Sequence, residues 1–91
     1  MNVDEYTDRI IEHYGAETQM HVAIEECSEL IQALTKTLRG EDIGDNLREE
    51  IADVYVCLME LRKMIEMEDK EVRIRIALKL QRTVDRMEHG R

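Results

Sequence analysis

The chain has 91 residues, of which 43% are hydrophobic and 37% charged, which suffices for a single domain over 1–91 and no more. It lacks proline, tryptophan and phenylalanine and has only four glycines, and this composition favours helix over sheet. A formal net charge of −8 argues against nucleic acid as a partner. No apolar run approaches the roughly 20 residues of a membrane span and no signal-peptide pattern opens the chain, so we expect no membrane contact and a cytoplasmic location.

Hydrophobic periodicity predicts four helices in chain order. The first covers about residues 3–14 and ends at Gly15, and the second covers about 17–39 and ends at Gly40. A polar loop over 40–45 leads to a third helix, for which Asp45 or Asn46 is the expected N-cap and whose end shows no breaker. The fourth covers about 70–88. We therefore expect an all-α, four-helix bundle-like fold.

The third predicted helix is apolar nearly all the way round. Such a helix needs cover on more than one side, and a chain of this length has few other elements to supply it. We therefore expect an obligate homo-oligomer, a dimer or a tetramer, to complete the fold. The apolar positions are Ile51, Ala52, Val54, Tyr55, Val56, Cys57, Leu58 and Met59.

Two pairs of acidic residues interrupt the apolar patterns of the second and third helices: Glu26 with Glu29, and Glu50 with Asp53. Residues three apart share a helix face. At about 100° per residue, Glu26 and Glu50 each lie inside the apolar arc of their helix, and Glu29 and Asp53 each lie at its margin. Acidic side chains are rarely buried without a partner, so four that point to one interior indicate a bound cation.

The ligand types indicate which cation this is. Carboxylate oxygens without histidine or cysteine at ligand spacing favour Mg²⁺, with Mn²⁺ as the alternative. A di-iron helical bundle would need Glu-x-x-His on two helices, whereas Glu29 and Asp53 stand where the histidines would be. Both cysteines, Cys27 and Cys57, lie on apolar arcs and are expected to be buried free thiols.

Charge is divided unevenly along the chain. Residues 1–69 carry 18 acidic and 6 basic residues, a balance of −12, and residues 70–91 carry 3 acidic and 7 basic, a balance of +4. On a helical wheel Arg75, Lys79, Arg82 and Arg86 form one basic stripe within about 60°. The stripe is either a solvated face that offsets acidic neighbours or a set of cations for a polyanion that the metal bridges to the protein.

The acidic pairs also carry a resemblance to a known family. Residues 15–19 and 24–30, followed by Leu34 and Lys36 and then by residues 49–55, resemble the MazG-like nucleoside triphosphate pyrophosphohydrolases. The shared motif is Glu-x-x-Glu, a spacer, and Glu-x-x-Asp, and the resemblance extends over about residues 14–86. It implies an all-helical enzyme that cleaves the α–β phosphoanhydride of a nucleoside triphosphate to the monophosphate and pyrophosphate.

The resemblance also assigns roles to residues. It implies that Mg²⁺ is bound by Glu26, Glu29, Glu50 and Asp53, and that Glu25 or one of these four orients the attacking water. The substrate phosphates would be bound by Lys36, Lys79, Arg82 and Arg86. Gln19 would face the nucleotide, or else is an exposed polar residue of the first helical turn. The alternative function is a non-catalytic helical oligomer that binds Mg²⁺–nucleotide or a protein partner.

Overall fold

The computed structural model describes residues 2–41 and 44–90, and within these ranges the chain is helical, without strands. The helices are α1 (Val3–Tyr14), α2 (Ala16–Leu38), α3 (Asn46–Met64) and α4 (Asp69–Glu88). The all-α prediction is confirmed, and the predicted helix limits agree closely with the observed ones. The predicted polar loop falls partly outside the described residues, because residues 42 and 43 are not among them.

The helix ends follow local chemistry. Asn2 caps α1 through its Oδ1, which accepts a hydrogen bond of 2.9 Å from the backbone of Glu5. Gly15, with φ of 90°, lets the chain pass directly from α1 into α2. The end of α3, for which the sequence shows no breaker, is set by Glu66 in the left-handed region with φ of 56°. The amide of Met67 then donates to the carbonyl of Arg62 at 2.9 Å, which is the Schellman arrangement of a helix C-terminus.

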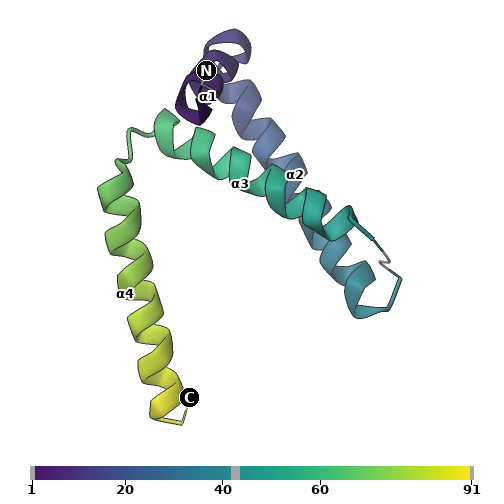
Figure 1. Cartoon of the computed structure of the whole chain (residues 1–91), viewed down its shortest axis with the longest axis vertical. Helices are drawn as coiled ribbons and strands as arrows, with labels where there is room; N and C mark the ends of the chain where they lie inside the picture. The colour runs from purple at the N-terminus through teal and green to yellow at the C-terminus, as the bar shows by residue number, and fades with distance from the viewer. Residues whose placement is uncertain (1, 42–43, 91) are drawn as a thin grey trace.

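Helices α2 and α3 form an antiparallel hairpin, and α1 packs against both at the hairpin end where α2 begins and α3 ends (Figure 1). The ammonium group of Lys63 on α3 ties α1 in place: it donates at 2.8 Å to both the carbonyl of Asp4 and the carboxylate of Asp8. The two hairpin helices meet along residues spaced alternately three and four apart, as in a coiled coil. These seam residues are Gln19, Ala23, Glu26, Leu30 and Ala33 on α2, and Glu50, Asp53, Cys57, Glu60 and Met64 on α3, all buried or half-buried.

The apolar core of the described chain is small. Its buried hydrophobic residues are Ala23, Ala33 and Cys57, and no large side chain is fully buried. The radius of gyration is 16.2 Å, against about 12 Å for a compact domain of this length. The solvent-accessible surface is 7511 Å², against roughly 5,500 Å² expected for a compact monomer of this mass. A single chain is therefore more open than a self-sufficient domain.

The openness comes from α4, which leaves the end of α3 and extends away from the other helices (Figure 1). Among the described residues, α4 packs against none of α1, α2 and α3. Its apolar side chains are between about half and two-thirds exposed: Ile74, Ile76, Leu78, Leu80, Val84 and Met87. The predicted bundle of four helices is therefore not complete within a single chain.

One burial prediction needs correction. Cys57 is buried as expected, but Cys27 is exposed, because nothing in the single chain covers the face of α2 on which it lies. Neighbouring Ile24 and Ile31 on that face are also exposed. Across the described ranges, no helix combines the length and apolar character needed to cross a membrane.

Candidate metal centre

Three polar pairs connect α2 to α3 along the seam. Gln19 donates from Nε2 to Oε1 of Glu60 at 2.6 Å. The side chains of Glu26 and Asp53 lie close together, and so do those of Glu29 and Glu50. In all three pairs the two residue numbers add up to the same value, as antiparallel helices in one register require. The hairpin register therefore brings the predicted acidic pairs of the two helices face to face.

The carboxylates of this acidic cluster (Glu26, Glu29, Glu50 and Asp53) converge closely. One oxygen each from Glu26, Glu29 and Glu50 lie within 4.8 Å of one another. Asp53 completes the cluster through its contact with Glu26. In an octahedral Mg²⁺ site, with oxygens 2.0–2.1 Å from the ion, neighbouring ligands lie about 2.9 Å apart and only opposite ones about 4.2 Å. The three carboxylates lie close enough to surround one ion, although binding it directly would draw neighbouring oxygens closer together.

Two oxygens of the cluster lack hydrogen-bond partners. Oε2 of Glu26 and Oε2 of Glu50 are buried, and no donor of the described residues reaches either of them. A buried carboxylate oxygen without a donor is costly, because it has lost water and gained nothing in exchange. A divalent cation would satisfy both oxygens at once, so the donor set fits the predicted Mg²⁺.

The electrostatics of the cluster agree with this interpretation. Burial raises the pKa of Glu26, and the negative charges of Glu29, Asp53 and Glu50 raise it further. The pKa of Glu50 is raised in the same way, by burial first and then by Glu29 and Asp53. Without a cation these carboxyls therefore repel one another and hold protons more tightly than ordinary glutamates. A bound cation would reverse the effect.

The remaining predicted site residues are not all brought to the cluster. Glu25 is exposed and sits one position before Glu26 on α2. Lys36 is also exposed and lies seven residues after Glu29, about two turns further along the same face. Three residues of the predicted basic stripe, Lys79, Arg82 and Arg86, are on α4, which does not approach α2 or α3 in this chain. Within one chain, these three residues therefore do not reach the acidic cluster, where the substrate phosphates are expected.

Gln19 differs from its sequence interpretation as an exposed residue, since only 7% of it is exposed and its amide is hydrogen-bonded to Glu60. Its predicted nucleotide contact stays a prediction. Glu60, only 4% exposed, was not singled out from the sequence. A signal for it exists: Gln19 stands seven residues before Glu26 and Glu60 seven after Asp53, so both continue the faces that carry the acidic cluster.

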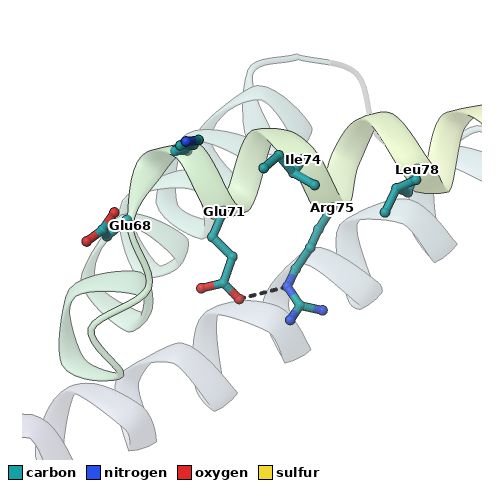
Figure 2. A pocket seen from close by; sticks show the side chains of 6 residues that line it. Glu68, Glu71, Ile74, Arg75 and Leu78 are labelled. Carbon is teal, nitrogen blue, oxygen red and sulfur yellow. Dashed lines mark hydrogen bonds and ion pairs between the residues drawn. The ribbon is translucent and has the colours of Figure 1, made fainter.

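The hollows of the surface lie elsewhere. One runs along the first turns of α4, where Ile74 and Leu78 flank an ion pair between Arg75 and Glu71 at 2.9 Å (Figure 2). A second, of about 430 Å³, lies between the end of α3 and the start of α4 and is almost entirely apolar. Neither contains a residue of the acidic cluster. Both are better explained as uncovered packing surface than as a site for chemistry.

Comparisons with known proteins add no assignment. No family model matches the sequence, and no curated protein or solved structure is significantly similar to it. The functional interpretation therefore depends on the geometry of the acidic cluster and on the motif that carries the family resemblance.

Proposed function

We propose that this chain is a Mg²⁺-dependent nucleoside triphosphate pyrophosphohydrolase of the MazG-like kind, acting as a homo-oligomer. The observation that carries the proposal is the convergence of Glu26, Glu29 and Glu50 with two buried oxygens that lack donors. An accidental acidic patch would face water, where each oxygen is solvated. Here Glu26 and Glu50 are half-buried on facing helices of the hairpin, and Glu29 lies at the exposed margin of the same cluster.

The proposed chemistry matches what the residues can do. Transfer of a phosphoryl or nucleotidyl group demands positioning and charge neutralisation rather than a covalent nucleophile. The metal would supply that neutralisation and lower the pKa of a bound water. Glu26, Glu29, Glu50 and Asp53 would fix its position from two rigid helices. Glu25, exposed beside them, is one candidate to orient the attacking water, and a carboxylate of the cluster is the other.

The oligomer is supported by surface and charge. The single chain exposes about 2,000 Å² more than a compact monomer of its mass, and an obligate dimer buries 2,000 Å² or more in total. The exposed apolar side chains of α4 are interleaved with basic ones, whereas the rest of the chain is strongly acidic. We propose that α4 packs on a second copy and adds the charges of Lys79, Arg82 and Arg86 to the phosphate side of its site.

The proposal is tested by incubating the protein with Mg²⁺ and each canonical and deoxynucleoside triphosphate in turn. Separate assays then follow pyrophosphate and the nucleoside monophosphate. We expect equal amounts of the two products, because cleavage between the α and β phosphates yields one of each. Release of inorganic phosphate with a diphosphate would contradict the assignment, since it places the cut at the γ phosphate.

The same samples distinguish the enzyme from the alternative, a non-catalytic oligomer that binds Mg²⁺–nucleotide. It predicts Mg²⁺-dependent nucleotide binding in equilibrium dialysis with no product from any triphosphate. An enzyme of the proposed kind releases product with every triphosphate that it binds productively.

A further inference from the structure

We propose that the buried Gln19–Glu60 pair is a positioning device: it fixes the register of the α2–α3 hairpin and thereby holds the acidic cluster together. This inference rests on the proposed function for its biological meaning, although the register itself is a property of the hairpin. The pair is polar, nearly inaccessible and joined by a hydrogen bond of 2.6 Å. It lies two helical turns from the Glu26–Asp53 contact, about 10.5 Å along each helix.

The hairpin needs such a device because its apolar seam specifies register weakly. Its buried apolar residues are Ala23, Ala33 and Cys57, none of them large, and its larger members, Leu30 and Met64, are only half-buried. Register in a helix pair normally comes from large side chains that fit one set of holes. Small residues allow one helix to slide past the other with little change in packing. The seam without its polar pair would therefore tolerate several alignments.

A shift of three residues, close to one turn, would divide the acidic cluster. It moves α3 by about 4.5 Å along α2, nearly as far as the 4.8 Å that encloses the three converging oxygens. Glu26 would then lie opposite Glu50, but Glu29 would lie opposite Leu47 and Asp53 opposite Ala23. The metal ligands cannot specify the register themselves, because in the absence of a cation Glu26, Glu29, Glu50 and Asp53 repel one another.

The Gln19–Glu60 pair discriminates against that shift. In the shifted alignments the carboxyl of Glu60 loses the amide of Gln19 and becomes a buried acid without a partner, which is strongly unfavourable. Only the observed register satisfies it. A buried polar group that fixes the alignment of helices at some cost in stability is the best-established role for such pairs.

The test measures register directly and does not depend on metal. Spin labels are attached to Thr35→Cys and Arg48→Cys, both at exposed positions, in a background of Cys27→Ser and Cys57→Ala. Pulsed EPR on samples diluted with unlabelled protein then gives the distance between α2 and α3. We expect one narrow distribution for the parent and a broad or displaced one for Gln19→Leu/Glu60→Leu, with helical content retained.

Two further variants separate positioning from mere stability. In Gln19→Glu/Glu60→Gln the amide and the carboxyl change places and the hydrogen bond can re-form, so we expect the narrow distribution to return. The matched control Glu17→Leu/Gln32→Leu removes one carboxyl and one amide at exposed positions of α2 and should leave the distribution unchanged. Leucine replacement of the buried pair should not lower the melting temperature, because apolar substitutes for a buried polar pair are often neutral or stabilising.

Mn²⁺ titration of the same proteins links register to the site. We expect Gln19→Leu/Glu60→Leu to bind Mn²⁺ at least about ten-fold more weakly than the parent, because loss of a residue that orients metal ligands commonly has an effect of this size. The exchanged variant Gln19→Glu/Glu60→Gln should bind Mn²⁺ within about two-fold of the parent. An unchanged narrow distance distribution in the leucine pair would overturn the inference. If the parent binds no Mn²⁺, the proposed function fails on its own, and the distances still decide whether the pair fixes the register.

Discussion

The α2–α3 hairpin and α4 are opposites in almost every respect. The hairpin carries Glu26, Glu50, Asp53 and Glu60 on its inner seam and has little apolar volume between its helices, whereas most apolar and basic residues of α4 are exposed. The acidic cluster of the hairpin has negative charge without a counter-ion. Helix α4 has apolar surface that α1, α2 and α3 do not cover. In the homo-oligomer that we propose, α4 of one copy supplies the apolar cover and the positive charge that the hairpin of the other lacks.

The largest effect is expected from neutralising a carboxylate of the hairpin. Glu50→Gln should lower kcat/KM at least about 100-fold, because a metal ligand is lost, while the oligomer stays folded. Steady-state pyrophosphate release measures this. The neighbouring Glu49→Gln, exposed on the same helix, is the control and should stay within about two-fold of the parent. Full activity in Glu50→Gln would remove that residue from the site.

A second large effect is expected on α4. Ile76→Asp/Leu80→Asp replaces two apolar side chains of α4 with charged ones; each of the two is more than half exposed in the single chain. If a second copy covers them, burial of these charges is prohibitive and the oligomer should dissociate to monomers in sedimentation velocity. The control Gln81→Asp, at an exposed polar position of α4, should stay assembled. An unaltered oligomer in the double variant would show that this face of α4 is free in solution.

A moderate effect is expected from pH. Because the folded-state pKa values of Glu26 and Glu50 are raised above the ordinary 4.5, their favourable contribution is present below about that pH and is lost as pH rises through the folded pKa. Without metal, Glu26→Gln/Glu50→Gln should therefore become progressively more stable than the parent as pH rises above 4.5.

Thermal unfolding in EDTA over a pH series measures this difference. Saturating Mg²⁺ at neutral pH should reverse the order, because the ion binds only the parent cluster. A melting difference that is constant with pH would show that the carboxyls do not interact in the folded protein.

The smallest effect is expected at the junction between the two regions. Glu66 adopts φ of 56°, which disfavours any residue with a Cβ. Glu66→Gly should therefore stabilise the protein by about 0.5 kcal/mol, the relief of strain being partly offset by the greater freedom of glycine in the unfolded chain. Chemical denaturation measures the change. Glu68→Gly is the matched control: Glu68 has φ of −68°, so the same substitution there should not stabilise.

Sequence periodicity was sufficient for the helices and for the acidic pairs. Glu26 and Glu50 interrupt apolar stripes, and a helical wheel alone shows that they point inward. The end of α3 could not be predicted from the sequence. It depends on Glu66 in the left-handed conformation of a helix C-terminus, and glutamate is not a residue that indicates this conformation. Cys27 illustrates a second limit: an apolar arc indicates which face needs cover, and not whether the same chain provides it.

The Gln19–Glu60 contact shows where single-helix reasoning ends. Each residue is polar and, taken on its own helix, fits an exposed position. Their burial follows only when the two helices are aligned side by side, with Gln19 opposite Glu60. Reading the two helices as one seam would have found the pair.

Mn²⁺ titration, monitored through the EPR signal of the free ion, decides whether the acidic cluster binds a divalent cation. We expect saturable uptake by the parent protein, uptake retained in Glu49→Gln, and uptake abolished in Glu26→Gln/Glu50→Gln. Equal uptake by the parent and the doubly neutralised variant would contradict this expectation.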